Sequence, residues 1–183
     1  MKICIISDSH DQIDLFHSAL ADAKERGAEL VLHCGDVVAP YTLKKANQFG
    51  LPIHVIHGNN KGDIAVMGKL SQNPDSLINY HGRDASLEIN GRMIFMVHFP
   101  DYAEALALTG KWDLICCGHN HRCKIESIEH NSSNNNKTTL LVNPGSSSGM
   151  DRVQPTYIFG DLETMKFKIV DIPEPDLPPY RRP

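Results

Sequence analysis

Short apolar runs alternate with helical segments through the first half of the chain, and this alternation limits the fold more than any other feature. Residues 2–7, 30–34 and 53–57 are apolar runs of the length that is typical of buried strands. Apolar residues recur at helical spacing from Ile13 to Ala23, Pro40 opens a second helical segment, and Asp63 caps a short third one. Strands that alternate with helices at this period form βαβ units, so a parallel sheet is expected.

Strands dominate the second half of the chain. Runs with strand character cover residues 85–89, 92–97, 114–117, 124–130, 138–142, 156–161 and 166–172. Asn90-Gly91 is a hairpin signal between the first two runs, and residues 101–109 are the one helix expected in this half. The polar run 131–137 is expected to form a long loop. The two halves together predict an α/β protein.

Length and composition exclude several classes of protein. The chain has 183 residues, which suits one domain, expected over residues 1–172 and followed by a proline-rich tail at 173–183. A net charge of −4 gives no basic footprint for nucleic acid. No apolar run approaches the roughly 20 residues of a membrane span, and the N-terminus does not resemble a signal peptide. The five cysteines suit free thiols, so a cytoplasmic location is expected.

Residue types that bind metals follow five of the apolar runs. They are Asp8 and His10, Gly35-Asp36, Gly58-Asn59-Asn60, His98, and Gly118-His119-Asn120-His121. Ligands of open α/β sheets lie at the carboxyl ends of the strands. Any one of these residues alone is more simply explained as a cap, a turn or a packing residue, but five strand ends that all carry ligand types are not. The sequence therefore predicts a metal site formed by all five segments.

The kinds of ligand indicate the kind and number of metal ions. Mixed carboxylate, carboxamide and imidazole groups suit first-row divalent ions better than Mg²⁺ or Ca²⁺. Mn²⁺ is the expected ion, and Ni²⁺, Co²⁺, Fe²⁺ or Zn²⁺ also fit. Two acids, one Asn and four His exceed what one ion can take, so two divalent ions that share a carboxylate are expected.

One known family carries these residue types in the same order. The calcineurin-like metallophosphoesterase superfamily resembles this chain in the set Asp8-x-His10, Gly35-Asp36, Gly58-Asn59, His98 and Gly118-His119-x-His121. The length and the turn Asn143-Pro144-Gly145-Ser146 are similar to its small prokaryotic phosphodiesterase branch. The resemblance extends from Met1 to about Ile172. It implies a four-layer αββα sandwich of two mixed β-sheets flanked by helices, with a dinuclear metal site at one edge and the turn at 143–146 supporting the metal loops.

The resemblance also implies a role for each residue. One metal is held by Asp8, His10 and His121, the other by Asn59, His98 and His119, and Asp36 bridges them. The implied reaction is hydrolysis of a small phosphoester, with a diester favoured over a monoester, by in-line attack of a metal-bridging hydroxide on phosphorus. The candidate catalytic residues are Asp36, Asn59, Asn60 and His98. A homodimer or tetramer is compatible with the resemblance, which does not name the substrate.

Two positions depart from the usual pattern of the superfamily. Asn60 stands where a His is common, and its amide can donate hydrogen bonds but no proton at neutral pH. Activated or aryl leaving groups are therefore expected to be preferred. Phe99-Pro100 follows His98 where a second His is usual, so Phe99 either packs against the sheet or forms an apolar rim for the substrate. Asn60 and Phe99 are the candidate substrate contacts, whereas Asp11 is expected to cap the first helix.

Two other classes of function compete with hydrolysis. A protein-interaction scaffold of the same fold would be catalytically weak or inactive, but it gives no physical reason to keep four converging histidines. A structural zinc site could draw on Cys116, Cys117, Cys123, His119 and His121. Adjacent cysteines on a strand point to opposite faces, and the chain has no CxxC pair, so this spacing is poor for zinc.

Overall fold

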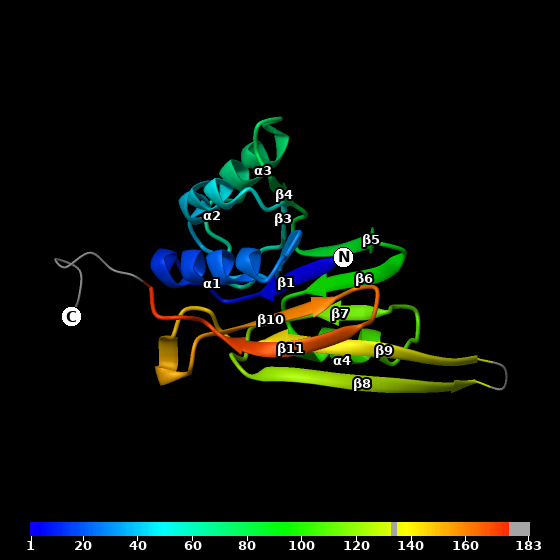
Figure 1. The fold of residues 1–183 in the computed structure, drawn as a ribbon. Coiled ribbons are helices and arrows are strands. Elements are labelled where there is room, and N and C mark those ends of the chain that lie inside the picture. The colour runs from blue at the N-terminus through cyan, green and yellow to red at the C-terminus, as the bar shows by residue number, and fades with distance from the viewer. Residues whose placement is uncertain (133–134, 176–183) are drawn as a thin grey trace.

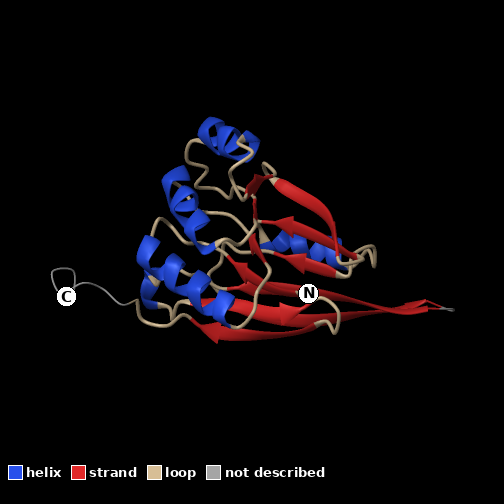
Figure 2. Ribbon diagram, turned by 45° about the horizontal axis from the view of Figure 1, so that its top comes forward, coloured by secondary structure: helices blue, strands red, loops and turns tan. Residues whose placement is uncertain are grey.

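Two β-sheets pack face to face in the computed structural model, with helices on both outer sides (Figure 1 and Figure 2). The structure describes residues 1–132 and 135–175. The six strands of the first sheet are, in spatial order, β11 (Lys166–Asp171), β10 (Thr156–Asp161), β1 (Lys2–Ile6), β2 (Leu30–His33), β3 (Ile53–Val55) and β4 (Ile78–Tyr80). The five strands of the second are β5 (Asp84–Ile89), β6 (Arg92–Val97), β7 (Leu114–Cys116), β9 (Asn135–Pro144) and β8 (Cys123–Ser132).

Helices lie outside the two sheets. Three of them follow β1, β2 and β3 in turn: α1 (Ile13–Glu25), α2 (Pro40–Ala46) and α3 (Ile64–Gln72). A 3₁₀ turn, Asn47–Phe49, continues α2, and a second, Met150–Arg152, precedes β10. The helix α4 (Pro100–Ala107) follows β6 in the second sheet. Within the described residues, no helix has the length and apolarity needed to cross a membrane.

The apolar core has three layers, which is what a four-layer sandwich requires. Alternate residues of β1 face opposite ways: Cys4 and Ile6 pack under α1 and α2, whereas Ile3 and Ile5 meet the second sheet. The outer face of the second sheet is covered by the small residues Ala103 and Ala107 of α4. The expected αββα sandwich of two mixed sheets is therefore confirmed.

Strand direction brings the loops of the candidate site to one edge. The strands β1, β2, β3 and β4 are parallel, and so are β6, β7 and β9. The loops that follow parallel neighbours leave a sheet on the same side. The remaining strands pair antiparallel and extend the two sheets away from this edge.

Two parts of the sequence prediction were wrong. The strand β4 was not predicted, because three residues are too few to show a period and one of them is Asn79. The long loop expected at 131–137 is instead mostly strand: β8 reaches Ser132, β9 begins at Asn135, and these two residues pair. Backbone hydrogen bonds form such a ladder whatever the side chains are. A polar run can therefore be a strand without the apolar alternation that predicts one. Figure 1 shows this hairpin extending beyond the body of the molecule.

The proline-rich tail is described only at its start. Ser18 Oγ of α1 donates a hydrogen bond to the backbone oxygen of Pro173 at 2.7 Å, so the chain still lies against α1 at that point. The rest of the tail, residues 176–183, lies outside the described residues.

Two stacked histidines connect β3 to the segment after β4. The rings of His54 and His81 are 5.0 Å apart and 11° from parallel, and His54 Nδ1 and His81 Nε2 share a hydrogen bond of 2.7 Å. Burial, followed by the neighbouring His81, lowers the pKa of His54 to about 4. Burial also lowers the pKa of His81.

Acid is expected to weaken the fold through this pair. An unfolded His takes up a proton near pH 6.5, whereas folded His54 resists it down to about pH 4, so this contribution to stability is present above pH 6.5 and is lost as the pH falls. We expect His54 to account for a loss of about 1–2 kcal/mol in the free energy of unfolding between pH 7 and pH 5. Urea unfolding of the wild type and His54→Gln at both pH values measures this, and an equal pH dependence in the two proteins would contradict it.

Candidate metal centre

The structure brings together all seven residues that the sequence predicted as metal ligands. Asp8 and His10 lie just after β1, Asp36 after β2, and Asn59 after β3. His98 follows β6 directly, and His119 and His121 follow β7. Five loops from two different sheets therefore contribute to one site.

A first group consists of Asp8, His10 and His121. Asp8 Oδ1 lies 3.5 Å from Nε2 of His121 and 3.9 Å from Nε2 of His10, and the two nitrogens are 3.4 Å apart. Asp8 Oδ1 is buried and accepts no hydrogen bond from any residue in the described ranges. A buried carboxylate oxygen without a donor is costly, so its direction toward two imidazole nitrogens fits a bound cation.

A second group is built around Asn59. Its Oδ1 lies 3.0 Å from Nε2 of His98 and 2.8 Å from Nδ1 of His119. His98 donates from Nδ1 to the backbone oxygen of Cys34 at 2.8 Å, so in the neutral imidazole Nε2 carries the lone pair. Two acceptors, His98 Nε2 and Asn59 Oδ1, then face each other. A cation between them would turn this repulsion into coordination.

Asp36 lies between the two groups. One carboxylate oxygen is 3.8 Å from His10 Nε2, and the other is 3.6 Å from His98 Nε2. This is the position that the family resemblance implies for a bridging carboxylate. Neither group of candidate ligands found among the described residues contains a cysteine, so the geometry gives no support to a structural zinc site at Cys116, Cys117 or Cys123.

The backbone is strained where it presents these side chains. Positive φ angles occur at Asp8 (52°), His10 (41°), Asp36 (55°), His119 (72°) and His121 (56°). Non-glycine residues rarely adopt such angles, and each costs on the order of 1–3 kcal/mol. Among the described residues, five of the ten non-glycine residues with positive φ are predicted ligands, so such angles are concentrated at the site.

Two glycines let the loops pack against the ligands. A Cβ atom at Gly58 would overlap Asp36 Oδ1 and lie 2.6 Å from His98 Nε2. One at Gly118 would overlap Ser7 Oγ and lie 2.6 Å from Asp8 Oδ2. Neither position tolerates a side chain while the neighbouring ligand keeps its place.

Asn60 holds the central carboxylate. Its backbone nitrogen donates to Asp36 Oδ1 at 2.8 Å, and its Nδ2 donates to Asp36 Oδ2 at 2.7 Å. The sequence predicted a substrate contact for Asn60, and the structure shows in addition that its amide group is engaged by Asp36. The sequence contains no signal for this contact, because it joins loops from two strands.

Further residues support the metal loops from behind. Ser146 Oγ donates to the backbone oxygen of Asp8 at 3.0 Å, and Asn143 Nδ2 donates to that of Gly118 at 2.9 Å. The turn at 143–146 therefore supports these loops, as the resemblance implied. The buried His33, which the sequence did not single out, shares a hydrogen bond of 3.0 Å with Ser9 Oγ, and burial lowers its pKa to about 3.

Asp11 has a different role from the predicted one. Its carboxylate accepts hydrogen bonds from Ala39 N at 2.9 Å and Thr42 Oγ1 at 2.6 Å, at the start of α2. The first helix begins after Gln12, without a side-chain cap. The prediction that Asp11 caps the first helix was therefore wrong, because the strained turn at 8–11 directs it to the neighbouring loop.

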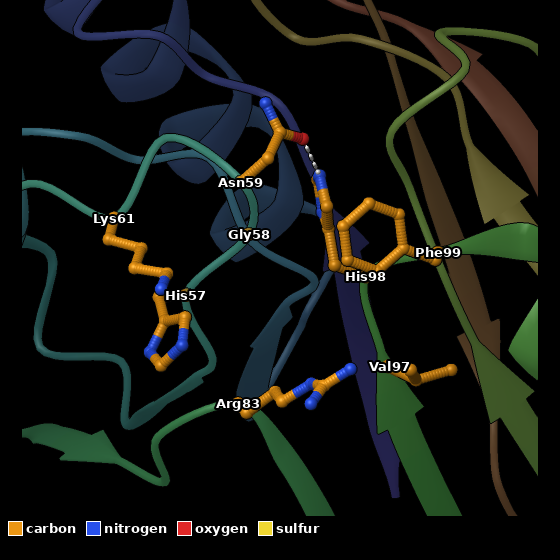
Figure 3. A pocket seen from close by; sticks show the side chains of 8 residues that line it. All are labelled: His57, Gly58, Asn59, Lys61, Arg83, Val97, His98 and Phe99. Carbon is orange, nitrogen blue, oxygen red and sulfur yellow. Dashed lines mark hydrogen bonds between the residues drawn. The ribbon is translucent and has the colours of Figure 1, made fainter.

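Phe99 packs on two of the predicted ligand rings. Its ring meets His98 at 5.2 Å and His119 at 4.8 Å between centroids, both edge to face. It also lines a cavity of about 340 Å³ beside the second group (Figure 3). The residues that line it are His57, Gly58, Asn59, Lys61, Arg83, Val97, His98 and Phe99. The sequence left two alternatives for Phe99, packing against the sheet or forming an apolar rim for the substrate. Its position beside the cavity fits the apolar rim.

Two basic side chains line this cavity. Lys61 and Arg83 both face it (Figure 3). Burial, and after it the charges of Lys61 and Arg83, lowers the pKa of His57. His57 is therefore neutral at pH 7 and shares a hydrogen bond of 2.6 Å with the hydroxyl of Tyr80.

The fold and the convergence of acids, an amide and imidazoles at one sheet edge define a metal-dependent hydrolase of phosphate esters. A model of the calcineurin-like phosphoesterase superfamily domain matches residues 1–165, so the chain belongs to that superfamily. This confirms the resemblance that was inferred from the motifs.

Individual relatives agree with this assignment. The phosphodiesterase MJ0936 of Methanocaldococcus jannaschii is 26% identical over 172 residues, which cover 92% of this chain and 97% of that protein. The solved structure of an archaeal phosphodiesterase superposes with a TM-score of 0.76 at 26% identity, covering 93% of this chain and 99% of the other. The phosphoesterase Yfce of E. coli shares the fold, with a TM-score of 0.59 at 16% identity over 94% of this chain and 100% of that chain.

Proposed function

We propose that the protein is a dinuclear phosphodiesterase that acts on small phosphodiesters in preference to monoesters. The observation that carries this proposal is the position of Asp36, whose two oxygens approach His10 of one ligand group and His98 of the other. Two divalent ions held there, Mn²⁺ foremost, would act as Lewis acids and lower the pKa of a water for in-line attack on phosphorus. The seven residues that would hold them are Asp8, His10, Asp36, Asn59, His98, His119 and His121.

Other residues of the site orient the ligands and leave room for the substrate. Asn60 fixes both oxygens of Asp36, and Cys34 O fixes the ring of His98, so the ligands are oriented before any ion binds. Phe99 packs edge to face against the rings of His98 and His119 and so restricts the orientations of both. The adjoining cavity of about 340 Å³ offers room for the second ester group of a diester.

The choice of leaving group follows from Asn60. This residue stands beside the site and has no proton to give, so it offers the leaving group no general-acid help. Loss of a general acid typically costs about 10²–10⁴ in rate, most for poor leaving groups. Aryl diesters are therefore the expected substrates of choice in the test tube, and the relative MJ0936 is named a phosphodiesterase.

One experiment tests the proposal. The protein is stripped with a chelator, reloaded with Mn²⁺, and assayed with bis(4-nitrophenyl) phosphate and with glycerol 2-phosphate, while metal content is measured by mass spectrometry. We expect two ions per chain, no turnover without metal, and kcat/KM at least about 10²-fold higher for the aryl diester. Equal rates on the two esters would contradict the preference for activated or aryl leaving groups over alkyl monoesters. No bound metal and no turnover would favour the interaction scaffold.

We propose that the enzyme acts in the cytoplasm. All five cysteines are free thiols in the structure, which suits the reducing cytoplasm. Residues 1–172 are proposed to act as one domain, and a homodimer or tetramer stays a prediction that light scattering can check.

A further inference from the structure

The cavity beside the second ligand group continues into another one. A second cavity of about 410 Å³ is lined by Phe95, Val97, Tyr102 and Leu106, together with Arg83 and Asp84. Arg83 and Val97 line both cavities. A groove therefore leads from Asn59 and His98, past Arg83, to an apolar region between β6 and α4.

Two exposed cations stand along this groove, which Asp84 also lines, and neither forms an ion pair among the described residues. Lys61 comes from the loop after β3 and Arg83 from the loop between β4 and β5, and Figure 3 shows both among the residues around the cavity. Among the described residues, neither Lys61 nor Arg83 makes an ion pair or a side-chain hydrogen bond. Some other surface cations do form ion pairs: Arg26 pairs with Asp22 at 2.8 Å, and Lys124 with Glu126 at 2.7 Å.

Arg83 is also oriented by a neighbour. Its guanidinium carbon lies over the ring of Tyr102, 5.9 Å from the centroid. A cation–π contact of this kind restrains the side chain without neutralising it. The guanidinium keeps its five donors available for an oxyanion, which Arg recognises better than Lys does because its donors form a planar fork.

These observations deepen the proposed function, on which they rest. The metal centre would already neutralise one phosphoryl group, so two further unpaired cations in the adjoining space exceed what a simple diester needs. We infer that the substrate carries a second phosphate, bound by Arg83 and Lys61, and beyond it an aromatic group that lies in the groove beside Tyr102. The proposed substrate is thus a nucleotide-like phosphodiester. The esterified group that lies in the groove carries the second phosphate.

Calorimetry with two matched nucleotides tests this inference. The Mn²⁺-loaded protein is titrated with thymidine 5′-monophosphate and with thymidine 3′,5′-bisphosphate, which differ by one phosphate. We expect the wild type to bind the bisphosphate at least about tenfold more tightly, beyond the twofold statistical advantage of two phosphates. In Arg83→Gln, and further in the double variant with Lys61→Gln, the ratio of the two Kd values should fall to about two.

A charge-matched control is Lys69→Gln. Lys69 is exposed on α3 and lines neither cavity, so its removal changes net charge equally and should leave the tenfold ratio intact. Equal affinity of the wild type for both nucleotides would overturn the inference, and so would a ratio that survives the loss of both cations. Because binding is measured without turnover, failure here is distinct from failure of the proposed hydrolysis, which the aryl diester assay reports separately.

Discussion

Asp36→Asn is expected to lower kcat/KM for bis(4-nitrophenyl) phosphate by about 10³-fold, comparable to the loss of a major electrostatic contact in an active site. Asp36 is the one predicted ligand whose two oxygens approach both groups, at 3.8 Å from His10 and 3.6 Å from His98. An amide keeps the size of the side chain but removes the charge and one acceptor. The variant should also bind less than two equivalents of metal, which mass spectrometry measures together with the kinetics.

A matched control for this variant is Asp63→Asn. Asp63 loses the same charge on the loop before α3, and its side chain caps that helix by accepting from Ala65 N and Val66 N. Asn is an equally good cap, so fold and activity should both be preserved. If Asp36→Asn retained near-normal activity and two equivalents of metal, the bridging position proposed for Asp36 would be wrong.

Gly58→Ala is expected to reduce both activity and metal content without any change of charge. The added methyl group would overlap Asp36 Oδ1 and crowd His98 Nε2, so at least one of these ligands must move. A displacement of about 1 Å at a catalytic group costs on the order of 10²-fold in rate. Overpacking of this kind also costs about 1–3 kcal/mol of stability. Metal analysis, kcat/KM and thermal unfolding record the three effects.

The control for this substitution is Gly68→Ala in α3. A Cβ atom at Gly68 meets nothing within 4 Å, and the residue is helical. Ala is about 0.5–1 kcal/mol more favourable than Gly inside a helix, so this variant should be slightly more stable and fully active. Similar behaviour of the two variants would show that the contacts around Gly58 do not constrain the metal centre.

Most of the fold could be predicted from local patterns. The strands β1 and β2 and the helix α1 show clear apolar periods, because one side or both sides of each are buried in a core. β4 could not be predicted, since its three residues form a strand only through pairing with β3. The outer end of the β8–β9 hairpin could not be predicted for a related reason. It is a strand pair through its backbone pairing, and its polar sequence shows no apolar alternation.

The types of side chain that follow the strands could be read from the sequence alone. Asp8, Asp36 and His98 each follow an apolar run, and a carboxylate or an imidazole binds metal wherever the fold places it. Parallel strands send the loops that follow them to one edge, which is why the residue types and their order were enough to predict the site. The identity of the family was contained in the same pattern.

Only the tertiary structure decided how the residues are combined. The contacts of Asn60 with Asp36, of Phe99 with His119, and of Arg83 with Tyr102 join loops or elements whose separation depends on how strands, helices and sheets pack. Such distances are set by the burial of apolar layers on both faces of each sheet, and no local period records them. The sequence by itself determined which groups can hold metal, whereas packing determined what orients them and which cations line the adjoining groove.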